Sequence, residues 1–117
     1  MSAKDNIKEL KEFVKLRREY TMKLVEMESD EQDLWRGVAK ELNDEIEEWK
    51  QIEGLEGIEQ FGVGGHTNNY KLTVRFRCSI DEHFYPTLKG LMKIEEKTGL
   101  RMLGNPNNLS VFEFVIL

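Results

Sequence analysis

The chain changes character at Gly54, and this change constrains its fold more than any other feature of the sequence. Residues 1–53 contain no proline and a single glycine, Gly37, and nearly half of them are charged. Residues 54–117 hold the other eight glycines, both prolines and the only stretches whose apolar residues alternate with a period of two. Because helices and strands require different periods, we expect a helical segment over residues 1–53 and a sheet segment over residues 54–117.

The composition is typical of one folded domain spanning residues 1–117. Its 39% hydrophobic and 33% charged residues fit a globular chain rather than a disordered one. No apolar run approaches the roughly 20 residues of a membrane span, and the N-terminal residues lack the apolar stretch of a secretory signal. A single cysteine, Cys78, excludes an internal disulfide. We therefore expect a cytoplasmic protein that does not associate with membranes.

Charge is divided unevenly within the helical segment. Residues 4–23 carry a net charge of +3, whereas residues 24–53 carry −8, and the whole chain carries −5. A basic stretch followed by an acidic one of similar length predicts two helices that pair, because complementary fields select a partner and its orientation. The overall acidity argues against a dedicated duplex-DNA-binding protein.

Apolar spacing in the helical segment predicts one helix over about Lys4–Met27 and a second over about Asp30–Glu53, ended by Gly54. The first stripe is wide enough to contact more than one neighbour. Ser29 and Gln32 match a capping box, which predicts the break between the two helices near residue 29. Their matched lengths favour an antiparallel helical hairpin. The alternative is a single helix of about 50 residues that forms a coiled coil between chains.

The sheet segment predicts four strands and one crossover helix that has Pro86 in its first turn and Gly99 after its end. The predicted strands are Ile58–Val63, Tyr70–Cys78, Leu100–Leu103 and Leu109–Leu117. The fold class is therefore α+β, with a helical hairpin or coiled coil followed by a four-stranded antiparallel sheet. The order β-β-α-β-β after the second helix is that of a circularly permuted ferredoxin-like unit, with the second and fourth strands in the centre.

One glycine-rich loop could hold a ligand. Gly62, Gly64 and Gly65 precede His66, and glycines let backbone amides approach a phosphate. Such loops bind phosphate where they lead into the N-terminus of a helix, whereas the segment that follows here is predicted to be a strand. The lysine of a P-loop is also missing. A hairpin turn is the favoured interpretation. The alternative is a small-ligand or nucleotide-binding loop.

The polar face of the second strand carries Lys71, Arg75 and Arg77. Open sheets can bind single-stranded nucleic acid through such a face, with aromatic side chains that stack on the bases. No aromatic residue falls on this predicted face, so an exposed basic strand is the favoured interpretation and nucleic-acid binding the alternative.

No arrangement of residues predicts catalysis or metal binding. His83 follows Asp81 and Glu82, but a metal site needs three or four ligands at compatible spacing. We interpret this cluster as the acidic first turn of a helix and Cys78 as a small core residue. We therefore expect no metal, no cofactor and no enzymatic activity.

A stripe with two tryptophans is the strongest candidate for an interaction surface. Trp35, Val38, Leu42 and Trp49 recur at helical spacing on the second predicted helix. Their simplest interpretation is core packing. The functional interpretation is a contact between copies, where aromatic residues are enriched. We expect a non-enzymatic interaction or assembly protein that forms a homodimer through its helical segment. The alternative partner is another protein.

Overall fold

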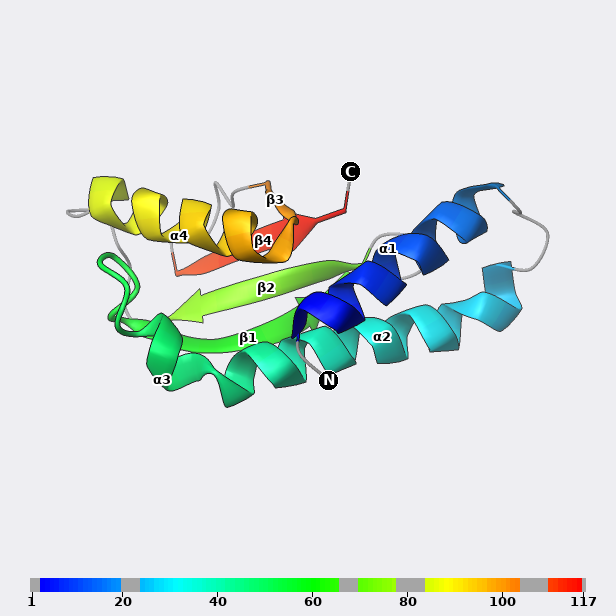
Figure 1. The fold of residues 1–117 in the computed structure, drawn as a ribbon, viewed down its shortest axis with the longest axis horizontal. Helices are drawn as coiled ribbons and strands as arrows, with labels where there is room; N and C mark the ends of the chain where they lie inside the picture. Colours follow the sequence, from blue (N-terminus) through cyan, green and yellow to red (C-terminus); the bar gives the residue numbers. More distant parts are fainter. Residues whose placement is uncertain (1–2, 20–23, 66–69, 78–83, 104–109, 117) are drawn as a thin grey trace.

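The structure of the chain is a computed structural model that describes residues 3–19, 24–65, 70–77, 84–103 and 110–116. These residues form helices together with a four-stranded antiparallel sheet, so the predicted α+β class is confirmed (Figure 1). The helices are α1 (Ala3–Glu19), α2 (Leu24–Asp44), α3 (Ile46–Trp49) and α4 (Phe84–Thr98). The strands are β1 (Ile58–Gly64), β2 (Lys71–Phe76), β3 (Arg101–Met102) and β4 (Val111–Val115).

The sheet has the order β1-β2-β4-β3, with β2 and β4 in the centre. Every pairing is antiparallel. The alternation predicted for β2 is present, because Leu72, Val74 and Phe76 are buried while the residues between them point to the other face. Phe112 and Phe114 of β4 are also buried, and Phe114 lies opposite Leu72.

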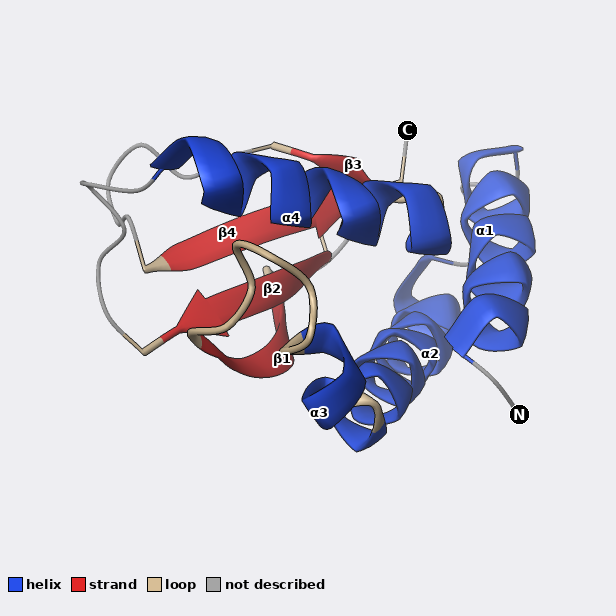
Figure 2. Ribbon diagram, turned by 60° about the vertical axis from the view of Figure 1, so that its left-hand side comes forward, coloured by secondary structure: helices blue, strands red, loops and turns tan. Residues whose placement is uncertain are grey.

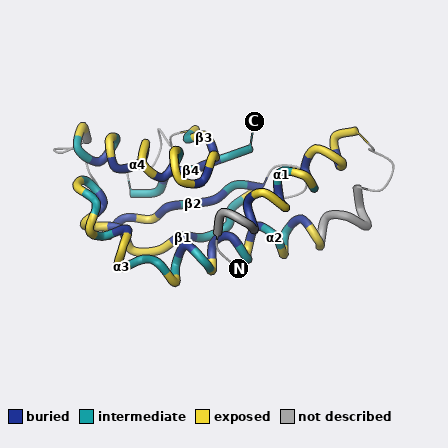
Figure 3. Tube along the Cα trace, in the orientation of Figure 1, coloured by how far each residue is buried: buried dark blue, intermediate teal, exposed yellow. Residues whose placement is uncertain are grey.

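In the part of the chain that the structure describes, the helices lie on the face of the sheet that carries Leu72, Val74 and Phe76. Side chains from α2 and α4 join the buried residues of the strands in one core cluster. α2 contacts β1 and α4 contacts β3, so on this one face α2 covers the β1 edge and α4 covers the β3 edge (Figure 2). α1 packs mainly on α2 and touches α4. The burial pattern along the chain shows that the other face of β2 is more exposed (Figure 3).

The break between the first two helices is not where the capping box predicted it. α1 ends at Glu19 and α2 begins at Leu24, so Ser29 and Gln32 lie inside α2. The prediction near residue 29 is therefore wrong. A capping box is compatible with a helix start but does not enforce one, and the residues around it contain neither glycine nor proline to interrupt the helical hydrogen bonds.

The second predicted helix is also interrupted. α2 ends at Asp44, Glu45 has φ −98° and ψ 11°, and the single turn of α3 follows. Turns then lead to Gly54, which has a positive φ of 92°. The predicted helix over about Asp30–Glu53 is therefore wrong in its bounds, because α2 begins at Leu24, the last helical turn ends at Trp49, and turns occupy the residues up to Gly54.

The boundaries of the crossover helix are confirmed. Pro86 lies in the first turn of α4, and Gly99 follows its last residue with φ 72°. The Gly99 N–H donates to the Glu95 carbonyl at 2.7 Å, a typical helix end at a glycine.

Candidate functional site: the outer surface of the helical segment

The tryptophan stripe lies in the core of the chain. Trp35, Val38, Leu42 and Trp49 are each at most 4% exposed. The centroid of the Trp49 ring lies 5.9 Å from that of the Phe61 ring, and the Lys97 ammonium lies 5.0 Å from the Trp49 centroid. The burial of these four side chains agrees with the interpretation of the stripe as core packing. Because these side chains are buried, the stripe is not available at the surface for contact with a second copy.

The basic face of β2 is mixed in charge. Lys71 Nζ lies 3.5 Å from Glu113 Oε2 on the neighbouring strand, and both side chains are largely shielded from solvent. Arg75 and Arg77 are exposed. The aromatic residues of the described strands are on the buried face, so this face offers no stacking surface within the part of the chain that the structure describes.

The glycines of the predicted loop belong in part to β1. Gly62 lies opposite Thr73, and Gly64 lies opposite Lys71. A Cβ atom at Gly62 would come within 2.9 Å of Thr73 Oγ1, so this glycine makes room for a cross-strand side chain. Only Gly65, with φ 86°, lies beyond the strand among the described residues. His66 lies outside the described residues.

The remaining chemical candidates, Cys78, Asp81, Glu82 and His83, also lie outside the described residues. Within the described ranges, no group of three or more histidine, cysteine, aspartate or glutamate side chains is placed to hold a metal ion.

Contacts between α1 and α2 set the register of the two helices. Asn6 Nδ2 donates to Glu41 Oε1 at 2.7 Å near one end of α1. Near the other end, Arg17 Nη2 donates to Glu31 Oε1 at 3.1 Å, and Arg17 Nε lies 2.8 Å from Glu31 Oε2. In these contacts the start of α1 meets the later part of α2, and the end of α1 meets its earlier part.

This register leaves an apolar strip on the outside of the helix pair. Ile7, Leu10 and Val14 point into the core. Leu16, on the opposite side of α1, is 50% exposed, and Phe13 is half-buried. Leu34 of α2, level with Phe13, is also half-buried and packs against the edge of the core. We call Phe13, Leu16 and Leu34 the outer strip. The wide apolar stripe of the first helix predicted more than one neighbour, and α1 contacts both α2 and α4.

A cleft on the other side of α1 was not foreseen from the sequence. It has a volume of about 600 Å³. Its lining residues are Lys11, Val14, Lys15, Arg18, Glu19, Gly99, Arg101 and Ile116. We call it the basic cleft, because four of its side chains are cationic and one is acidic. The spacing of Lys11, Lys15 and Arg18 by four and three residues was the signal in the sequence that could have indicated it.

Among the described helices, none is long and apolar enough to cross a membrane. Comparisons with protein families, with curated proteins and with solved structures find no match for this chain.

Proposed function

We propose that the protein is a non-enzymatic interaction protein that forms a homodimer through its helical segment, with α1 and α2 folded as a helical hairpin. The observation that carries this proposal is the outer strip, in which Leu16 is 50% exposed although it lies on an ordered helix. Complete burial of an exposed leucine contributes about 1.5–3 kcal/mol. Because Leu16 is already half buried, covering the rest of it contributes about half of that to association. The contact surface is the outside of the helix pair rather than the buried stripe of Trp35 and Trp49.

The sheet topology supports a special role for α1. We interpret β1 to β4, α2 and α4 as the circularly permuted ferredoxin-like unit, because the strand order β1-β2-β4-β3 is the one that this permutation requires. In that unit two helices cover one face of the sheet, and α2 and α4 do so here. α1 is then an additional helix that the unit does not need, and its outer side is available for a partner.

Exposed charges of opposite sign on the two helices favour a second copy as that partner. Glu9 and Glu12 are exposed on α1, one turn before Phe13 and Leu16, and Arg36 is exposed on α2, on the side of that helix away from Leu34. If α1 of one copy packs on α2 of the other, these opposite charges lie across the interface twice, once for each half of a twofold dimer. An interface of this kind has an apolar centre and a charged rim.

We expect Leu16→Glu to weaken self-association by about tenfold or more, because each copy would place a carboxylate where a leucine had been buried. The measurement is the mass in solution by light scattering after size-exclusion chromatography, over a range of protein concentrations. Met92→Glu is the matched control, since Met92 is also 50% exposed but lies on α4. A wild-type protein that stays monomeric would refute the dimer, and equal weakening by the two variants would refute the assignment of its contact to the outer strip.

Gly37→Ala is expected to raise the free energy of unfolding by about 0.5–1 kcal/mol, because glycine inside a helix is less favourable than alanine by that amount. Space is available, since the nearest atom to an added Cβ is Asn6 Nδ2 at 3.9 Å. Chemical denaturation of both proteins at one concentration measures the difference. A loss of stability would contradict the expectation and would place another group, such as a second copy, in the space beside Gly37.

A further inference from the structure

The basic cleft separates α1 from the turn that joins α4 to β3. Lys11, Lys15 and Arg18 line one wall and span about 10 Å along α1 at 1.5 Å per residue. Arg101 of β3 lines the opposite side. Arg101 Nε lies 3.9 Å from Glu95 Oε2, the longest of the ion pairs in the described residues. Cationic side chains therefore approach the cleft from two elements that are far apart in the sequence.

Lys11 and Arg18 of α1 bind neutral carbonyl groups, so among the lining residues only Glu19 offsets the positive charge of the cleft. Lys11 Nζ donates to the Gly99 carbonyl at 3.0 Å, and Arg18 Nη2 donates to the Ile116 carbonyl at 3.2 Å. A carbonyl is a neutral acceptor, so it orients the cation without cancelling its charge, and the remaining donors of each group stay available. Lys15 is exposed and forms no hydrogen bond or ion pair with any described residue.

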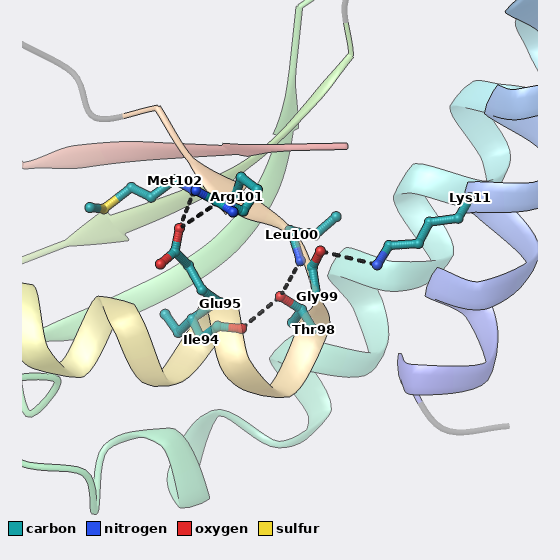
Figure 4. Close-up of polar contacts among 8 residues, drawn as sticks. All are labelled: Lys11, Ile94, Glu95, Thr98, Gly99, Leu100, Arg101 and Met102. Carbon is teal, nitrogen blue, oxygen red and sulfur yellow. Dashed lines mark hydrogen bonds and ion pairs between the residues drawn. The ribbon is translucent and has the colours of Figure 1, made fainter. Parts of the chain in front are cut away.

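The wall opposite α1 is held in place by its own hydrogen bonds (Figure 4). Thr98 Oγ1 donates to the Ile94 carbonyl at 2.6 Å and accepts from the Leu100 N–H at 3.2 Å. The Met102 N–H donates to Glu95 Oε2 at 2.7 Å. These contacts fix the backbone around Gly99, and with it the acceptor for Lys11. A ligand would therefore meet a preformed wall, which lowers the ordering cost of binding.

We propose that the basic cleft binds a small molecule that carries two or more phosphoryl or carboxylate groups. The volume of about 600 Å³ lies in the range of small-molecule sites, roughly 300–1,000 Å³. Val14 and Ile116 supply an apolar part of the lining. Two anionic groups a few ångströms apart would satisfy cations spaced along α1, and arginine suits phosphate and carboxylate oxygens equally. This binding site is separate from the outer strip and does not depend on the proposed dimer.

The test is titration with pyrophosphate and with citrate at low ionic strength, followed by calorimetry and by the amide signals of the protein. We expect Lys15→Glu to weaken binding by about tenfold or more, because one attraction becomes a repulsion inside the cleft. Lys8→Glu is the matched control. Lys8 is exposed on the same helix and changes the net charge equally, but it does not line the cleft. This control should alter binding by less than about twofold.

Each outcome of the titration decides the proposal. Binding that is lost in Lys15→Glu, retained in Lys8→Glu and accompanied by shifts of the Gly99 and Ile116 amides supports it. The tighter of pyrophosphate and citrate then identifies the chemistry of the ligand. Absence of binding at millimolar concentrations of both anions overturns it, as does equal weakening in the two variants. Because Leu16 does not line the cleft, Leu16→Glu should keep anion binding even where it abolishes the dimer.

Discussion

Gly54→Ala is expected to lower the free energy of unfolding by about 2–5 kcal/mol, because backbone strain and a backbone clash act together. Gly54 has φ 92°, a conformation that residues with a Cβ adopt only at a cost. An added Cβ would lie 2.0 Å from the carbonyl oxygen of Pro86 in the first turn of α4. The turn and α4 would have to separate, which would disturb the packing of the nearby core. Urea denaturation followed by circular dichroism measures the loss.

Two other glycines separate the contributions to this loss. At Gly57 an added Cβ would meet only Phe76 Cδ1 at 3.9 Å, so Gly57→Ala should change the stability little. Gly99 has φ 72°, but its Cβ would meet the flexible end of Lys11 rather than backbone. Gly99→Ala should therefore cost about 1–3 kcal/mol from backbone strain alone. Equal effects at Gly54 and Gly57 would contradict the role assigned to the contact with Pro86.

Local patterns in the sequence predicted the elements whose residues carry their own structural signal. The alternation from Tyr70 to Cys78 predicted β2 and its buried face, and Pro86 with Gly99 predicted both ends of α4. The break between α1 and α2 carries no such signal at Ser29, because serine and glutamine are tolerated inside a helix as well as at its start. Helical periodicity continues across that position, so it is compatible both with a break between two helices and with one continuous helix.

The candidate surfaces show a different limit of sequence reasoning. Periodicity assigns Leu16 and Leu10 to apolar positions of one helix, but it does not tell which neighbour covers each of them. Leu10 is fully buried, whereas Leu16 is half exposed. The basic cleft was missed because Lys11 and Arg101 are 90 positions apart, and only the folded chain brings them to one cleft. Long-range placement of this kind depends on the packing of α1 against α4, which no local pattern encodes.

Glu31→Gln is expected to lower the free energy of unfolding by about 3–5 kcal/mol, because it leaves the Arg17 guanidinium buried beside a neutral group. The side chains of Arg17 and Glu31 are 9% and 2% exposed, and they join α1 to α2 through the contacts at 2.8 and 3.1 Å. Arg17→Met should cost a similar amount, because it leaves the Glu31 carboxylate without this partner. Urea denaturation of each variant measures both losses.

The double variant Arg17→Met, Glu31→Leu should recover most of the stability that either single change removes. Replacing a buried ion pair by apolar residues of similar volume is often neutral or stabilising, because the cost of removing both charges from water disappears with them. The single variants Arg17→Met and Glu31→Leu, together with the double variant, form the double-mutant cycle that isolates the energy of the pair. If the losses of the two single variants instead add in the double variant, Arg17 and Glu31 stabilise the α1–α2 contact independently, and the ion pair is not what joins the helices.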